Sequence, residues 1–154
     1  MHAQVFVITS GFWQYQAFVI QNNVATPLGS SFGWWGLMSM CVTDLDQGGK
    51  PELLFTYSWG SGLHRSRVAI WNGGKSITQA ATTVGRYDLI VEKIDDSHVH
   101  LAYGKFNGYT GEFDRLGDFG TAQLTNGMNG QQLKLLPPKR LPKEVSDEMW
   151  DSSN

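Results

Sequence analysis

Short runs rich in β-branched and aromatic residues recur along the first 136 residues of the chain. Side chains of these types pack well on a pleated sheet, so each run predicts a β-strand. We expect about nine strands, at residues 4–9, 14–21, 34–43, 53–58, 67–71, 86–94, 98–103, 121–124 and 132–136. The run at 34–43 is apolar at almost every position, which is typical of a central strand buried on both faces.

Turn-forming sequences separate these runs at short intervals. Residues 10–13 connect the first two expected strands, and residues 95–97 form an expected tight turn between antiparallel partners. Asn-Gly pairs occur at 72–73, 107–108, 126–127 and 129–130. Both residue types tolerate the positive φ angles of tight hairpin turns. The pattern therefore predicts an all-β fold, an antiparallel meander that forms a small sandwich or barrel.

The end of the chain differs from the rest. Prolines at 137, 138 and 142 favour an extended segment that leaves the sheet. A short helix is expected over residues 142–150, because Pro142 is tolerated in the first helical turn, where its missing N–H would be unpaired anyway. The sequence thus predicts one all-β domain at 1–136 and a proline-stiffened tail at 137–154.

Composition and charge narrow the functional classes. The 154 residues are 41% hydrophobic and 17% charged, enough apolar surface for one folded core. With 12 basic and 14 acidic side chains, the formal net charge is −2, which argues against a nucleic-acid-binding protein. The single cysteine, Cys41, excludes an internal disulfide and a multi-cysteine metal site, and its apolar surroundings predict an inert, packed thiol.

No membrane span or targeting segment is expected. The longest apolar stretch, residues 32–42, is well short of the ~18 residues that a spanning helix needs. The first residues lack a basic region and a small-residue cleavage site. Two locations are open: the cytoplasm, or a secreted protein whose signal was removed.

The sharpest motif is an acidic loop at residues 44–52, between two expected strands. Asp44 and Asp46 are two positions apart, glycines follow, and Glu52 lies eight residues after Asp44. Carboxylate oxygens that converge in a tight loop suit a hard cation such as Ca²⁺. Two interpretations are open. The loop binds calcium through these three side chains, or it is a plain turn in which the aspartates accept backbone hydrogen bonds and Glu52 is a solvated strand residue.

This loop resembles the FG-GAP and VCBS-type repeats, which carry Asp-x-Asp-x-Asp-Gly-x-x-Glu-Leu between two strands. Asp44, Asp46, Gly49, Glu52 and Leu53 match that pattern, whereas Gly48 stands where the family has its third aspartate. The resemblance implies a calcium-binding loop. It covers only about 15–30 residues and occurs once, too little for a full propeller of several such blades.

A second motif, Ser-Trp-Gly-Ser-Gly-Leu-His-Arg-Ser, follows within residues 58–67, and the phrase resembles uncharacterised bacterial proteins. Its glycines allow backbone N–H groups to face an anion, and its hydroxyl, imidazole and guanidinium groups are further donors. An ordinary hairpin loop is the alternative. The candidate binding residues are Ser58, Trp59, Ser61, His64, Arg65, Ser66 and Arg67.

His98 and His100 are two positions apart on an expected strand, which points both imidazoles to one face. This spacing serves a transition metal only if a third ligand arrives, and His64 or Asp96 are the candidates. A half-exposed polar strand is the alternative. Tyr109, in an expected exposed loop at 108–115, is the aromatic residue that we expect to contact a partner.

These features favour a non-enzymatic binding or interaction module of the inhibitor or immunity type, with an acidic loop that binds calcium structurally. Its partner would be a protein or a small anionic ligand. No constellation indicates a reaction class, so the sequence leans away from an enzyme. The alternative function is a binding protein or hydrolase for a phosphate- or sugar-containing ligand that uses residues 58–67.

Overall fold

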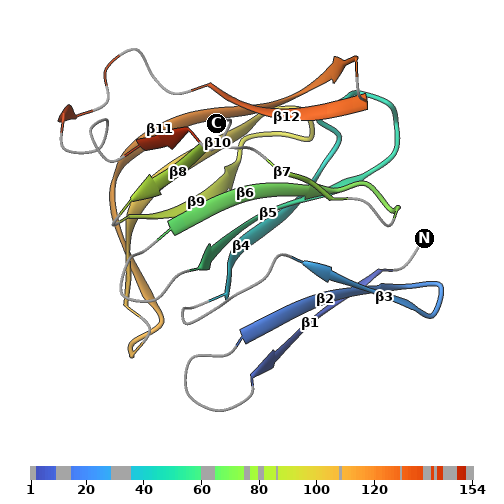
Figure 1. Ribbon diagram of the computed structural model, residues 1–154, viewed down its shortest axis with the longest axis horizontal. Coiled ribbons are helices and arrows are strands. Elements are labelled where there is room, and N and C mark those ends of the chain that lie inside the picture. The colour runs from blue at the N-terminus through green and yellow to red at the C-terminus, as the bar shows by residue number, and fades with distance from the viewer. Residues whose placement is uncertain are drawn as a thin grey trace.

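The computed structural model describes residues 3–9, 15–28, 36–59, 65–74, 77–79, 82–85, 87–107, 109–128, 130–136, 140, 142–143 and 149–151. Within these residues, thirteen strands form three sheets, and every strand pair is antiparallel (Figure 1). Each sheet has a linear strand order with two end strands, so the described part of the chain is a sandwich and not a closed barrel. The predicted all-β antiparallel fold is confirmed.

The three sheets follow the chain from its N-terminus to its C-terminus, apart from one returning strand. The N-terminal sheet contains β1 (Gln4–Thr9), β2 (Tyr15–Gln21) and β3 (Val24–Leu28), in that order. The central sheet has the order β13 (Met149–Asp151), β8 (Thr82–Gly85), β6 (Arg65–Trp71), β5 (Glu52–Trp59) and β4 (Gly36–Thr43), and β7 (Ile77–Gln79) pairs with β6. The C-terminal sheet has the order β12 (Gly130–Leu136), β11 (Glu112–Gly127), β10 (Val99–Asn107) and β9 (Asp88–Lys93).

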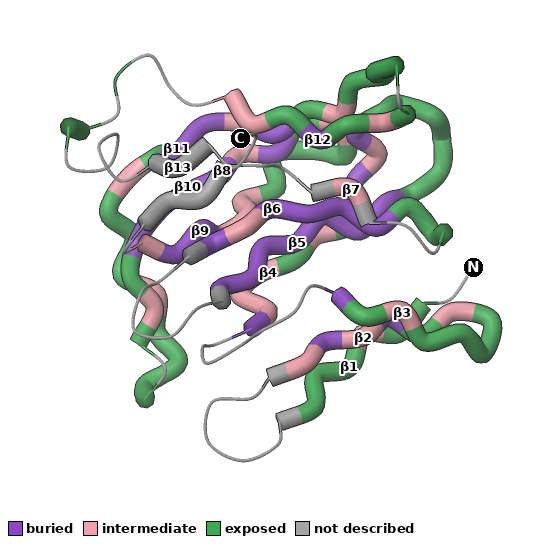
Figure 2. The backbone as a smooth tube through the Cα atoms, viewed as in Figure 1, coloured by how far each residue is buried: buried purple, intermediate pink, exposed green. Residues whose placement is uncertain are grey.

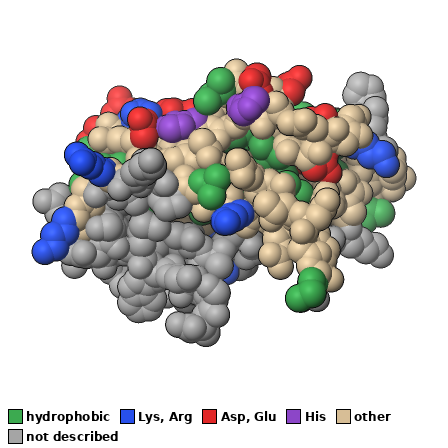
Figure 3. Space-filling view, turned by 90° about the horizontal axis from the view of Figure 1, so that it is seen from above, with side chains coloured by type: hydrophobic (Ala, Val, Ile, Leu, Met, Phe, Trp, Pro, Cys, Tyr) green, Lys and Arg blue, Asp and Glu red, His purple; other side chains and the backbone are tan. Residues whose placement is uncertain are grey.

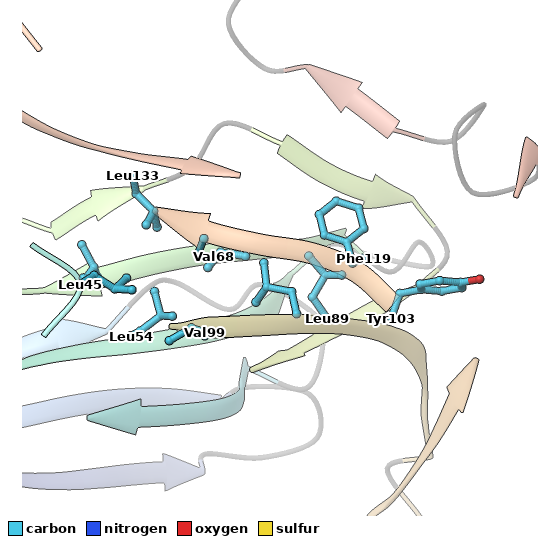
Figure 4. Packing of buried hydrophobic residues seen from close by; sticks show 11 residues of the cluster. Leu45, Leu54, Val68, Leu89, Val99, Tyr103, Phe119 and Leu133 are labelled. Carbon is cyan, nitrogen blue, oxygen red and sulfur yellow. The ribbon is translucent and has the colours of Figure 1, made fainter. Parts of the chain in front are cut away.

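The central sheet is covered on both faces, which gives the molecule two hydrophobic cores (Figures 1 and 2). One core joins it to the C-terminal sheet and includes Leu54, Val68, Ile70, Leu89, Leu101, Phe119 and Leu133 (Figure 4). The other core joins it to the N-terminal sheet and includes Ala17, Val19, Leu28, Leu53, Phe55, Tyr57 and Trp71. Successive side chains of β5 alternate between the two cores, and residues 52–58 are all buried.

The strand buried on both faces is therefore β5, and the prediction that residues 34–43 hold this place is wrong. Residues 34–35 lie outside the described residues, and β4 is an end strand of the central sheet whose Met40 and Val42 are exposed. Both runs are apolar, and hydrophobic pattern alone does not say which of two apolar strands lies inside the sheet.

Other boundaries also differ from the sequence-based expectation. β3, β7 and β8 were not predicted, and β3 contains Pro27, a residue that strands accept only at sheet edges. β11 begins at Glu112, so the second half of the expected loop at 108–115 is strand. In the tail, residues 144–148 of the expected helix lie outside the described residues, while Met149–Asp151 is a strand that pairs with β8.

Candidate metal centre

The acidic loop connects β4 to β5 at one end of the stack that the central and C-terminal sheets form. Positive φ angles at Gln47 (55°) and Gly49 (73°) turn the chain back on itself. Leu45 lies within the core between the central and C-terminal sheets and anchors the loop there. The loop conformation is thus fixed by burial at Leu45 and by backbone geometry at Gln47 and Gly49.

The structure brings the three predicted ligands together. Asp44, Asp46 and Glu52 each offer a carboxylate oxygen, and these oxygens all lie within 4.8 Å of one another. A Ca²⁺ ion with oxygen ligands at about 2.3–2.6 Å holds neighbouring oxygens at such separations. The i, i+2 and i+8 spacing therefore predicts the cluster correctly.

Backbone N–H groups orient each carboxylate. The N–H of Gly48 donates to Asp46 Oδ1 at 2.8 Å, and the N–H of Gly49 donates to both oxygens of Asp44 at 3.1 and 3.3 Å. Glu52 Oε2 accepts the N–H of Leu45 at 2.9 Å. The hydrogen bonds of the two aspartates match the plain-turn interpretation, but that interpretation is wrong for Glu52, whose residue is only 4% exposed.

The pKa values of Glu52 and Asp46 shift in opposite directions. Burial raises the pKa of Glu52 from its ordinary value of 4.5 to about 7, and the charges of Asp46 and Asp44 raise it further, while the Leu45 N–H opposes the rise. The Gly48 N–H and the Gln131 amide lower the pKa of Asp46. The causes of this rise that come from the described residues include no basic side chain.

The acidic loop also contacts the C-terminal sheet. Gln131 of β12 donates from Nε2 to Asp46 Oδ2 at 2.7 Å. Thr43 Oγ1 donates at 2.6 Å to the carbonyl of Asp96, in the turn between β9 and β10, and the Asp44 N–H donates to the same carbonyl. A cation in this loop would hold together a point at which the two sheets already meet.

Gly48, the departure from the FG-GAP pattern, has a local structural reason. A Cβ atom at this position would lie 2.7 Å from Asp46 Oδ1. Glycine therefore lets the Asp46 side chain fold back onto its own turn. An aspartate at this position would require the Asp46 carboxylate to move. The energetic cost is small, because the atom that must move is at the end of a side chain.

The predicted binding segment at 58–67 is only partly described, since Ser61 and His64, and the side chains of Trp59 and Arg65, lie outside the described residues. Ser58 and Ser66 are cross-strand partners, and both are fully buried. Solvent does not reach their hydroxyl groups, so the prediction that these two residues belong to a contact surface is wrong. Ser66 Oγ instead accepts the N–H of Leu89 at 3.1 Å. Arg67 pairs with Tyr57 and lies on the opposite face of the sheet from Ser66.

Tyr109 is where the sequence places it, in a turn after β10, with the residue 89% exposed. Its N–H donates to Asn107 Oδ1 at 3.0 Å, which fixes the turn while leaving the ring in solvent. Cys41 is half-buried, and burial raises the pKa of its thiol. Within the described residues, no helix is long and apolar enough to cross a membrane.

The two histidines do not share a site. His98 lies in the β9–β10 turn, where its Nδ1 is 2.8 Å from a carboxylate oxygen of Asp95. His100 Nε2 is 3.2 Å from Asp118 Oδ1, and Glu92 completes a second group of metal-ligand type. Histidine side chains lie beside acidic and basic ones along one margin of the molecule in Figure 3.

Sequence reasoning missed this second cluster, because its members come from three strands. Arg115 already bridges its two carboxylates: Nε and Nη2 donate to the two oxygens of Glu92 at 2.8 and 3.1 Å, and Nη2 also contacts Asp118 Oδ1. The guanidinium lowers the pKa values of both carboxyl groups. The cluster is an ion-pair network that joins β9, β10 and β11.

Comparisons with protein-family models, with curated proteins and with solved structures find no match. The resemblance of the acidic loop to FG-GAP and VCBS-type repeats therefore stays a prediction.

Proposed function

We propose that this chain is a non-enzymatic interaction module whose acidic loop binds one structural Ca²⁺ ion. The observation that carries the proposal is the convergence of Asp44, Asp46 and Glu52, with no basic side chain of the described residues among the causes of the raised pKa of Glu52. The second acidic cluster has Arg115 in that place. The loop thus holds concentrated negative charge for which a bound cation is the natural counterpart.

The loop offers the oxygen donors that calcium prefers. Each carboxylate oxygen that accepts one N–H bond retains a second lone-pair direction for a metal. Calcium takes six to eight oxygen ligands, so carbonyl groups of the loop and water would complete the coordination shell. Water would take the position that the third aspartate has in the FG-GAP pattern, where this chain has Gly48.

The position of the loop supports a structural role for the ion. The loop begins after β4, reaches β12 through Gln131 and reaches the β9–β10 turn through Asp96. A ligand that binds only the folded state stabilises it by about 2.7 kcal/mol at a hundred times its dissociation constant. Calcium would therefore fasten the central sheet to the C-terminal sheet at this end.

The interaction role rests on surface chemistry. The chain has few charged side chains, and Tyr109 presents an exposed ring. Aromatic surface of this kind is favoured at protein interfaces. A protein partner is therefore proposed, as in proteins of the inhibitor or immunity type.

Isothermal titration with CaCl₂ at pH 8 tests the calcium site. The wild-type chain and the control Asp114→Asn, which changes an exposed aspartate of β11, are expected to bind one ion. Asp46→Asn is expected to abolish binding, because it removes one of three charged ligands. Absence of binding to the wild-type chain at millimolar calcium, or equal binding by Asp46→Asn, would contradict the proposal.

A further inference from the structure

The first 43 residues contain no Asp, Glu, Lys or Arg, although they form the whole N-terminal sheet and β4. Of the eleven large hydrophobic side chains that are exposed among the described residues, seven belong to this segment. They are Phe6, Val7, Ile8, Ile20, Val24, Met40 and Val42. Exposed apolar surface of this density, without any charge, is typical of an interface.

Three of these seven side chains, Phe6, Ile8 and Ile20, lie on the outer side of the N-terminal sheet, whereas the registers of Val7 and Val24 place them on its core-facing side. Ala17 and Val19 of β2 face the core. Phe18 and Ile20 alternate with them and face outward, and the cross-strand partner of Phe18 is Phe6. Along β1, the exposed fractions of Phe6, Val7 and Ile8 are 45%, 51% and 57% (Figure 2).

β1 is an end strand that pairs only with β2, so the backbone groups on its other side have no strand partner among the described residues. Sheet edges are normally protected by charge, by proline or by a covering segment. β3, at the other end of the sheet, carries Pro27, and β9 and β12 carry Lys93 and Lys134. β4 lies against β9, where Ser39 Oγ accepts the N–H of Val91.

We propose that β1 pairs antiparallel with β1 of a second copy of this chain, which joins two N-terminal sheets into one continuous sheet. Charge favours a second copy as the occupant. A two-fold axis pairs the strand with an identical strand, so a strand with a net charge would repel its own copy. The strand Gln4–Thr9 has no charge to repel.

The two-fold axis also limits the register. An axis perpendicular to the sheet keeps outward-facing side chains on the same side in both copies. Residues opposite each other must then belong to the same face of the strand. The axis therefore passes between the two copies of one residue, and not between two copies of a peptide bond. The two registers that pair the most residues place Phe6 opposite Phe6, or Val7 opposite Val7.

This interface rests on the proposed interaction role but not on calcium binding, so we test it first in EDTA and then with CaCl₂. Sedimentation velocity from low micromolar to near-millimolar protein is expected to show a dimer. Phe6→Lys is expected to be a folded monomer by circular dichroism, because it places two positive charges near the axis. The matched control Ile94→Lys, at an equally apolar site that is 67% exposed in the β9–β10 turn, is expected to remain a dimer.

Cysteine cross-linking provides a second test if Phe6→Lys does not fold. In a Cys41→Ala background, mild oxidation is expected to link two copies through Phe6→Cys or through Val7→Cys, and not through Ile94→Cys. A wild-type chain that is monomeric throughout, or a dimer that neither strand cysteine cross-links, would overturn the interface. Monomers that still bind calcium overturn the interface alone, whereas EDTA-stable dimers that bind no calcium overturn the calcium site alone.

Discussion

At the scale of single residues, Glu52 is the group at which protons would compete with calcium in the proposed site. Its pKa is raised from 4.5 to about 7, chiefly by burial, so between these pH values the carboxyl group is protonated in the folded chain and ionised in the unfolded chain. The folded state then binds more protons, and the free energy of unfolding falls as pH rises through this range. Above about pH 7 both states are ionised and the loss is complete.

Glu52→Gln is therefore expected to remove most of this pH dependence. In EDTA, the wild-type chain should unfold at a lower temperature at pH 8 than at pH 5.5, and the variant should show a smaller difference. The amide of the variant still accepts the Leu45 N–H, so the loop is retained. Glu112→Gln, on the exposed start of β11, is the control and should behave as the wild-type chain. Equal pH dependence in all three proteins would show that Glu52 does not titrate in this range.

Calcium binding should depend on pH in the opposite sense. Because the ion requires the ionised carboxylate, its affinity is expected to rise as pH increases from 6 to 8 and to level off above the pKa of Glu52. Calcium titrations at the two pH values measure this change. An affinity that is independent of pH would exclude Glu52 as a ligand.

Gly48→Asp restores the third aspartate of the FG-GAP pattern. The new Cβ displaces Asp46 Oδ1, and the added carboxylate supplies a fourth acidic ligand. We expect tighter calcium binding and lower stability in EDTA, because a further negative charge joins the cluster. Gly48→Ala has the same Cβ without the charge and should not tighten binding. Equal calcium affinities for the two variants would place Gly48 outside the site.

The acidic site could be predicted because its three side chains lie in one nine-residue loop, where spacing in the sequence determines distance in space. The cluster of Glu92, His100 and Asp118 could not be predicted, since cross-strand registers bring it together. The two histidines illustrate the difference. Their i, i+2 spacing is correct for one strand face, but β10 begins only at Val99, so His98 belongs to the turn.

At the scale of elements, Ser58 and Ser66 form a natural matched pair. They are cross-strand partners with no exposed surface, but only Ser66 has a hydrogen-bond partner among the described residues, the Leu89 N–H. Ser66→Ala leaves that buried N–H unpaired and is expected to cost about 1–3 kcal/mol. Ser58→Ala is expected to be neutral or stabilising. Urea denaturation of both variants measures the difference, and equal losses would contradict this assignment.

Strand identity was easier to predict than strand position. Runs rich in β-branched and aromatic residues identify β1, β2, β10 and β12, and Asn-Gly turns adjoin the last two. Tertiary packing decides the order of strands in a sheet, and the hydrophobic pattern does not record it. The pattern therefore predicts the centre of the sheet at the apolar run that contains β4, whereas the structure has β5 there. The strand at 149–151 forms by pairing with β8, which is distant in the sequence. The local sequence therefore does not predict it.

At the scale of the whole molecule, the N-terminal sheet is attached through the core that contains Val19 and Phe55. Val19→Ala removes buried methyl groups from this core and is expected to cost about 2 kcal/mol. Hydrogen exchange should accelerate more in β1–β3 than in β9–β12, since the C-terminal sheet uses the other core. Uniform acceleration over the whole chain would show that the three sheets unfold only as one unit.

The measurement that most directly tests the calcium proposal is thermal unfolding at pH 8, in EDTA and then in saturating CaCl₂ at constant ionic strength. At a hundred times the dissociation constant, calcium should stabilise the folded chain by about 2.7 kcal/mol. For a domain of this size that corresponds to a rise in Tm of roughly 5–10 °C. Asp46→Asn should show no rise. Equal Tm values of the wild-type chain in the two buffers would mean that the acidic loop is a turn held by its own hydrogen bonds.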